Sequence, residues 1–391
     1  MGKPHWRLLV WWVLVFELVS LTSRAAVLEV GPGKKYVKPS EAANAAEDGD
    51  IIEITAGTYI HDVAIWAHND LTIRGAGGRA HLQADGAAAD EKAIWVIKGD
   101  DVTIENIEFS GARVRDKNGA GIRQEGTNLT VRDCYFHHNE MGILTDDDEA
   151  SEIVIERSEF AANAVAGDYE EGGSIGHNIY IGRVRRFELK FSYVHAGHIG
   201  HNVKTRAVES HILYNRIMDE AKGSSSYLID VSDGGTVYII GNVLQQGIYT
   251  DNSTLVAFAP ESRDNPSKGL YITNNTFVND HAGGIYIKNW SENTAARVVN
   301  NIFASVGDTI LDGRGELLSN LVTDAPGFID RARYDYRLIA SSPVIDMGTD
   351  PGSANGVSLI PLWQIRGVAD GEQRPKLGRL DLGAYEYGGA R

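Results

Sequence analysis

The chain has 391 residues, of which 43% are hydrophobic, enough for a large core in one extended domain or two compact ones. A formal net charge of −16 argues against nucleic-acid binding, and a single cysteine excludes both an intrachain disulfide and a cysteine-based zinc site. The 43 glycines and the scattered Asn-Asn, Asp-Gly and Gly-Gly pairs favour many short strands joined by turns.

The first 25 residues have the pattern of a secretory signal peptide. Lys3 and Arg7 precede an apolar run, and Ser23 and Ala25 occupy the small-residue positions of a cleavage site. We expect cleavage after Ala25 and a secreted or periplasmic protein; an uncleaved membrane anchor is the alternative. No later apolar stretch is long enough to span a bilayer, so the mature protein is expected to have no membrane contact.

Between about residues 26 and 330 a short strand pattern recurs, with alternating side chains and an apolar final residue. It is seen in "VTIENIEF", "LTVRDCYF" and "IVIERSEF", and again in "LYITNNTF" and "ARVVNNIF". The final residues, 23 to 34 positions apart, are Phe109, Phe136, Phe160, Val194, Ile217, Leu244, Phe277 and Phe303. Such spacing is typical of a coil of constant cross-section with loops of different length. We therefore predict an all-β fold, a single-stranded right-handed parallel β-helix of roughly nine to eleven coils.

A column of small and polar residues accompanies this repeat. Two positions before the final residues lie Ile107, Cys134, Ser158, Ser192, Asn215, Asn242, Asn275 and Asn301, and Asn320 is a candidate extension of the series. Asparagines stacked at one corner of successive coils would bond the neighbouring turns, as a buried amide requires. We predict that these asparagines are structural and that Cys134 is a core residue rather than a nucleophile.

The two ends of the repeat region differ from it. Residues 38–59 have the pattern of a short helix followed by a first strand, and a helix there would cover the open end of the solenoid. From about residue 331 to 391 the coil pattern is lost. We interpret this last part as a C-terminal capping segment rather than a separate catalytic domain.

The Asn-Asn-Thr-Phe and Asn-Asn-Ile-Phe coils, the start "GKKYVKPSEAANAAEDGDIIEITAGTY" and the ending "SPVIDMG…DLGAYEY" together carry a resemblance. The chain resembles bacterial right-handed parallel β-helix repeat proteins of the pectate-lyase-like superfamily, which includes polysaccharide lyases and alginate epimerases. The resemblance covers nearly all of the mature chain, and it implies a sugar-polymer substrate lying along the outer face of the coils. Pectinase-like hydrolases and phage tailspikes share this scaffold, so activity must be argued from the site.

A second strand in each coil supplies the candidate site. We align "HNIYIG", "HNVKTR" and "YLIDVS" so that their central Ile or Val side chains point inward and their neighbours, by strand alternation, point outward. The outward rows then contain Asn178 over Asn202, Tyr180 over Lys204 over Asp230, and Arg206 one outward step beyond Lys204. Four histidines lie in or beside these strands: His177, His195, His198 and His201.

This patch is locally basic on an acidic protein, which suits an anionic polysaccharide containing uronic acid. β-Elimination from a uronate needs a group that neutralises the carboxylate, a base that removes the C5 proton and an acid that protonates O4. Arg206 is the predicted neutraliser, Lys204 or His201 the base and Tyr180 the acid. As a base, Lys204 would need a depressed pKa, which Arg206 could supply. The predicted substrate-binding residues are Asn178, Asn202, His177, His198 and Asp230.

Two other classes of function remain open. A glycoside hydrolase could use Asp230 with Asp233 or Glu261 as its pair of carboxyl groups, and a non-catalytic polysaccharide-binding protein would need no base. A lyase and a C5-epimerase share their first step. We predict no catalytic metal at the four histidines and no required cofactor, although calcium is possible because residues 145–152 and the same three carboxylates offer oxygen ligands.

Overall fold

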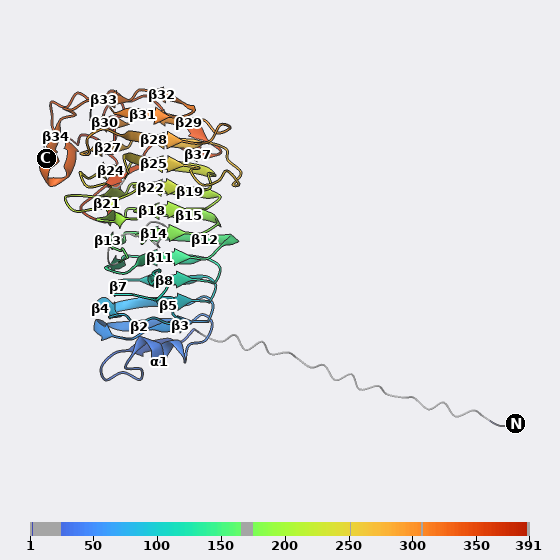
Figure 1. Cartoon of the computed structure of the whole chain (residues 1–391). Coiled ribbons are helices and arrows are strands. Elements are labelled where there is room, and N and C mark those ends of the chain that lie inside the picture. The colour runs from blue at the N-terminus through green and yellow to red at the C-terminus, as the bar shows by residue number, and fades with distance from the viewer. Residues whose placement is uncertain (1, 3–24, 166–174, 251, 306–307, 389–391) are drawn as a thin grey trace.

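The computed structural model describes residues 2, 25–165, 175–250, 252–305 and 308–388. The predicted signal peptide lies, except for residues 2 and 25, outside the described residues. Figure 1 shows the strands stacked as rungs of one solenoid, with α1 (Pro39–Ala43) at its N-terminal end. No helix in the described part of the chain is both long and apolar enough to cross a membrane.

The chain forms a right-handed parallel β-helix, as predicted, and its strands lie on three faces. The first face contains β1 (Val27–Val30), β2 (Ile51–Ile60), β4 (Thr72–Gln83), β6 (Val102–Glu105), β9 (Leu129–Arg132), β12 (Asp148–Glu156), β15 (Val184–Lys190), β19 (Glu209–Leu213), β23 (Thr236–Ile240), β26 (Leu270–Thr273), β29 (Ala296–Val299) and β32 (Gly315–Leu318). The second face contains β7 (Ile107–Ser110), β10 (Tyr135–His137), β13 (Glu159–Ala161), β16 (Tyr193–His195), β20 (Arg216–Met218), β24 (Val243–Gln246), β27 (Thr276–Asn279), β30 (Ile302–Ala304) and β33 (Leu321–Val322). The end of β4 extends the second face by pairing with β7, so the two faces form one continuous sheet.

The third face is a separate sheet of ten parallel strands, in agreement with the expected number of coils. It contains β3 (Ala64–Trp66), β5 (Ala93–Ile97), β8 (Ala120–Gln124), β11 (Met141–Thr145), β14 (Ile179–Ile181), β18 (Val203–Thr205), β22 (Ile229–Val231), β25 (Thr254–Phe258), β28 (Ile285–Asn289) and β31 (Thr309–Asp312). The remaining elements are β17 (His198–Ile199), β21 (Ser224–Ser225), β34 (Phe328–Asp330), η1 (Arg331–Arg333), β35 (Asp335–Leu338), β36 (Ser353–Ala354), β37 (Val357–Ser358), β38 (Trp363–Ile365) and β39 (Gly371–Gln373).

The core is built from like residues stacked on like residues. Phe109, Phe136 and Phe160 are fully buried, and their rings stack in parallel with centroids 4.9 and 4.7 Å apart. Parallel strands lie about 4.8 Å apart, so equal positions of successive coils bring their side chains into contact. The repeated apolar residue at the strand end is therefore the inward column of the second face.

The predicted asparagine column is confirmed. The Asn215 backbone N–H donates to Asn242 Oδ1 at 2.8 Å, and the same contact joins Asn242 to Asn275 and Asn275 to Asn301. Asn320 continues the series, since its Oδ1 accepts from the Asn301 backbone N–H at 2.9 Å. Each amide thus satisfies the polar backbone at one corner of the coil.

Cys134 is a core residue of this column, as predicted. Its Sγ lies 3.5 Å from the backbone N of Ile107, and its side chain is fully buried. Burial raises the pKa of the thiol to about 12. The group therefore stays protonated at neutral pH and is unsuited to nucleophilic chemistry.

A second amide ladder occupies another corner and was not predicted. Asn139, Asn163, Asn178 and Asn202 are fully buried, and each donates from Nδ2 to the oxygen of the next, ending at Asp219. The Asp219 carboxylate also accepts from Ser225 and from the backbone N–H of Gly247. A carboxylate accepts without donating, which makes it a suitable end for the ladder.

The prediction that Asn178 and Asn202 point outward is therefore wrong. Both residues lie at a bend immediately before β14 and β18, respectively, and not within those strands. Alternation of side chains holds only within a strand, and at the bend two consecutive residues face the interior. These amides cannot reach a substrate on the surface.

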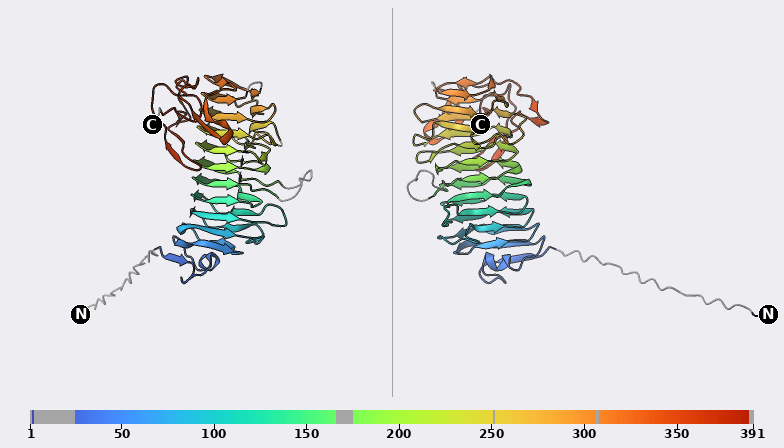
Figure 2. Two further views of the ribbon diagram at one scale, coloured as in Figure 1. Left: turned by 90° about the vertical axis from the view of Figure 1, so that its left-hand side faces the viewer. Right: turned by 45° about the vertical axis from the view of Figure 1, so that its right-hand side comes forward.

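The last part of the chain packs along the side of the solenoid (Figure 2). Leu359, Leu382 and Ala384 are buried in a cluster with outer side chains of the coils, such as Val243 and Ile302. A hydrogen bond from a coil to the last part of the chain reinforces this packing: the Thr273 hydroxyl Oγ1 donates to the Leu359 carbonyl at 3.0 Å. On β32, at the C-terminal end of the coils, Leu317 and Leu318 are exposed.

Candidate active site

Three short strands of the third face carry the candidate site. The register places Tyr180 of β14 beside Lys204 of β18, and Lys204 beside Asp230 of β22. In the same strands, the core contains the side chains of Ile179, Val203 and Ile229. By strand alternation, the next residue of each strand then points outward. The predicted row of Tyr180, Lys204 and Asp230 is therefore confirmed.

The side chains of this row form one ion-pair network. Lys204 Nζ lies 3.3 Å from Asp230 Oδ2 and also contacts Glu261 Oε1. Arg206 Nη1 donates to Asp233 Oδ1 at 2.6 Å. Arg206 Nη2 contacts Glu261 Oε2, and Arg206 Nε donates to the Tyr180 hydroxyl at 2.9 Å.

Glu261 occupies a special place in this network. It follows β25 in the chain, and its side chain is 44% exposed, whereas those of Lys204 and Arg206 are 9% and 22% exposed. Its two carboxylate oxygens contact the two cations, one oxygen each. The pair Lys204 and Arg206 is thus already arranged to hold a single carboxylate at the surface.

Lys204 is charged in this arrangement. Burial opposes the charge, but Asp230 and Glu261 outweigh burial and raise the pKa of Lys204 above its usual value. The expectation that Arg206 depresses this pKa is wrong for this state of the protein, because two carboxylates lie against the ammonium group. Lys204 can act as a base only when part of this negative charge is removed.

His201 is not suited to the role of base. The backbone N–H of Tyr227 donates to Nδ1 at 3.3 Å, which leaves the proton on Nε2, 3.3 Å from Asp230 Oδ2. Burial and the nearby Lys204 charge lower the pKa of His201 to about 3. The imidazole is therefore neutral, and its lone pair is occupied by the backbone.

His177, His201 and Tyr227 form a column of aromatic rings beside the charged row. The ring centroids are 5.0 Å apart at both steps, and His177 Nδ1 accepts from the backbone N–H of His201 at 2.9 Å. His177 and His201 are buried, which leaves Tyr227 the more accessible ring. Tyr227 was missed because its segment "YLIDVS" lacks the His-Asn pair that opens "HNIYIG" and "HNVKTR", although Tyr227 occupies the same position of the coil.

The other two histidines do not join this patch. His198 is exposed on β17, and its Nδ1 lies 2.6 Å from Ser224 Oγ. His195 lies on β16 of the second face, where its ring nitrogens contact Glu159 and Glu220. Short spacing in the sequence does not bring the four histidines together, because the chain turns a corner between β16 and β18.

The carboxylates proposed for the hydrolase alternative are engaged differently. Asp230 is buried with 1% of its side chain exposed, and burial raises its pKa against the opposing effect of Lys204. Its Oδ1 has no hydrogen-bond partner among the described residues. Asp233 and Glu261 both pair with Arg206, so Asp230 is placed to act on Lys204 rather than directly on a sugar.

The acidic run at 145–152 forms ion pairs. Asp146 contacts Arg123, and Glu152 contacts Arg185 at 2.6 Å. Arginine charges therefore compensate part of the run. A calcium site here stays a prediction.

Comparison with known proteins supports the fold alone. No family model matches the chain, and no curated protein matches it. Among solved structures, pectate lyase Pel9A is similar with a TM-score of 0.59 and 15% identity, over 94% of this chain and 98% of that chain. An alginate lyase from Paenibacillus sp. strain FPU-7 is similar with a TM-score of 0.52 and 15% identity, over 76% of this chain and 99% of that one. The chain therefore shares the parallel β-helix fold of these polysaccharide lyases.

Proposed function

We propose that the protein is a polysaccharide lyase that cleaves a uronic-acid-containing polymer by β-elimination. One observation carries the proposal: Lys204 and Arg206 together hold one exposed carboxylate, that of Glu261, at the surface of the third face. A uronate carboxylate has the same charge and shape; it would displace Glu261 and bind Arg206, which moves the charge of Glu261 away from Lys204. The fold shared with a pectate lyase and an alginate lyase supports the same substrate class.

The proposed reaction assigns one task to each group. Arg206 binds the substrate carboxylate and stabilises the charge that grows on it when the C5–H bond breaks. Lys204, freed from Glu261, first loses its own proton to solvent and then accepts the C5 proton. The electron pair of the broken C5–H bond forms the C4–C5 double bond. The C4–O4 bond then breaks, and Tyr180 gives its proton to O4. Tyr180 suits this task because its oxygen accepts from Arg206 Nε, which leaves its own O–H free to donate.

A C5-epimerase would share the first step, with return of a proton to the opposite face of C5. Export, as the first 25 residues predict, would bring either enzyme to an extracellular polymer.

Digestion of anionic polymers tests the proposed reaction. We expect one of alginate, pectate, glucuronan or a glycosaminoglycan to give a rise in ultraviolet absorbance, because each β-elimination creates one conjugated double bond, at the new non-reducing end. New reducing ends without that absorbance would show hydrolysis instead. Binding with neither signal on any of these polymers would contradict cleavage of the polymer.

Glu261→Gln is expected to move the acidic limb of the pH profile to lower pH. The carboxylate of Glu261 raises the pKa of Lys204, so its removal should lower that pKa. A base works in its deprotonated form, so below the pKa of Lys204 the value of kcat/KM should rise about tenfold per pH unit. Because that pKa is lower in the variant, the variant should reach the same kcat/KM at a lower pH. The measurement is kcat/KM against pH for both proteins. A limb that does not move would exclude Lys204 as the titrating group.

A further inference from the structure

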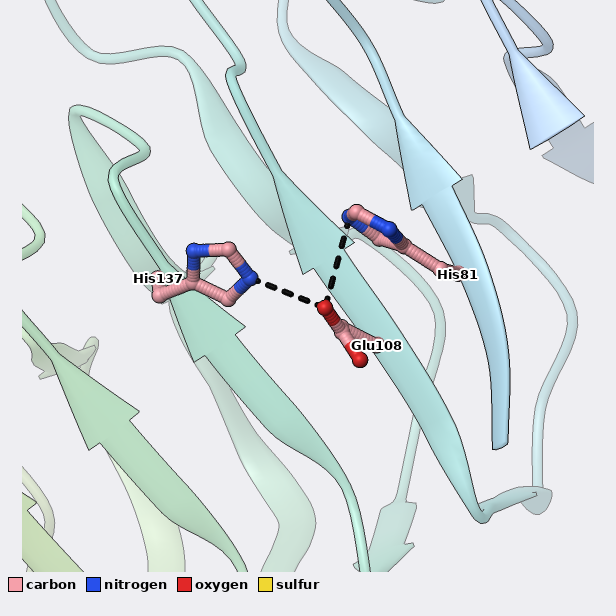
Figure 3. Close-up of side chains that lie close together, drawn as sticks. All are labelled: His81, Glu108 and His137. Atoms are coloured by element: carbon pink, nitrogen blue, oxygen red, sulfur yellow. Dashed lines mark hydrogen bonds and ion pairs between the residues drawn. The ribbon is translucent and has the colours of Figure 1, made fainter. Parts of the chain in front are cut away.

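The outer surface of the second face carries a cluster of metal-ligating side chains, on another face than Lys204 and in earlier coils. His81 lies on β4, Glu108 on β7 and His137 on β10, three neighbouring strands in successive coils (Figure 3). Glu108 Oε1 lies 3.5 Å from His81 Nε2 and 3.1 Å from His137 Nε2. Figure 3 shows both imidazoles directed at the same carboxylate oxygen.

These distances suit the ligands of one ion. The three donor atoms lie within 4.8 Å of one another. Ligand atoms at about 2.0–2.1 Å from a tetrahedral zinc ion are about 3.3–3.5 Å apart, close to the two separations from the Glu108 oxygen. The three side chains are 17–25% exposed, so the cluster is partly shielded but open to solvent on one side.

The surroundings prepare His137 to be a ligand. Without a metal, His137 Nε2 donates to Glu108 Oε1 at 3.1 Å, and its Nδ1 lies 2.8 Å from His138 Nδ1. When a metal binds Nε2, the ring proton moves to Nδ1, where His138 Nδ1 can accept it. Near the other ligand, Ser110 Oγ lies 2.7 Å from His81 Nε2.

We propose that His81, Glu108 and His137 bind a divalent transition-metal ion of the zinc class. Two imidazoles and one carboxylate form a ligand set typical of zinc, and three protein ligands leave at least one coordination position for water or a substrate oxygen. The site is on the second face and the Lys204 network on the third, so the proposal does not depend on lyase activity.

Titration of the untagged full-length protein with Co2+, after removal of bound metal by a chelator, tests the site. We expect one equivalent of Co2+ per chain with the visible absorption of a four- or five-coordinate ion, displaced by one equivalent of Zn2+. His137→Ala and Glu108→Gln should each weaken binding by at least about a hundredfold, and His138→Ala, which keeps all three ligands, by about tenfold.

His195→Ala is the matched control. His195 also lies on the second face beside two glutamates, and its loss should leave Co2+ binding unchanged. Melting temperatures of all variants establish that they are folded. The proposal is overturned if the native protein shows no stoichiometric Co2+ spectrum, or if that spectrum persists with unchanged affinity in both ligand variants. In the second outcome the ion binds elsewhere on the chain.

Discussion

Replacing Lys204 with arginine is expected to lower kcat on the cleaved polymer by at least about a hundredfold, with little change in KM. General-base catalysis contributes on this scale, and arginine does not release its proton in proteins. Arginine keeps the positive charge opposite Asp230 and Glu261, so neither carboxylate is left buried and unpaired. The measurement is the initial rate of ultraviolet absorbance increase over a range of substrate concentrations.

Lys288→Ala provides the control for this prediction. Lys288 stands in the same outward column as Lys204, two strands beyond Asp230, and it pairs with Asp312 at 3.3 Å. Replacing a surface lysine that has no catalytic role should lower the stability by less than about 0.5 kcal/mol and leave the activity unchanged. If Lys204→Arg retains full kcat while remaining folded, Lys204 is not the base.

Asn242→Ala is expected to lower the free energy of unfolding by about 3 kcal/mol. Asn242 Oδ1 accepts from both the backbone N–H and the side-chain amide of Asn215, and its Nδ2 donates to the Ile212 carbonyl and to Asn275 Oδ1. Alanine removes all four contacts, and the groups left behind are fully buried where water cannot replace the lost partner. Urea unfolding followed by circular dichroism measures the change as a lower midpoint.

Asn293→Ala is the matched control, since Asn293 is exposed in the turn before β29. Its replacement should change the unfolding free energy by less than about 0.5 kcal/mol. Equal midpoints for the two variants would mean that the ladder contributes little to stability.

The residues that repeat in every coil could be predicted from the sequence. Phe136 and Phe160 lie at the strand end and Asn242 lies two positions before it, and a solenoid places equal positions of successive coils on top of one another. The same logic predicted Tyr180, Lys204 and Asp230 as neighbours, because all three lie within strands where alternation holds. The His81, Glu108 and His137 cluster obeys the same register, but its histidines lie in no repeated motif, so the sequence pattern did not indicate them.

Prediction failed where the chain leaves a strand. Asn178 and Asn202 face inward because the coil bends just before β14 and β18, where strand alternation no longer gives the side-chain direction. His195 and His198 separate from His201 for the same reason, since a corner lies between them. Spacing along the chain gives the direction of a side chain only within a strand, and this relation is lost at a corner. The position of each corner depends on how the neighbouring coils stack.

By itself the sequence determined the parallel β-helix, its asparagine column and the row of outward side chains, since each follows from a repeated pattern with strand alternation. Only the tertiary structure decided the chemistry of that row. Glu261 is 57 residues from Lys204, and the loop after β25 brings its carboxylate back over two coils to both cations. The charge state of Lys204 and the neutral imidazole of His201 follow from that packing and from burial, which depend on three-dimensional contacts rather than on residue type.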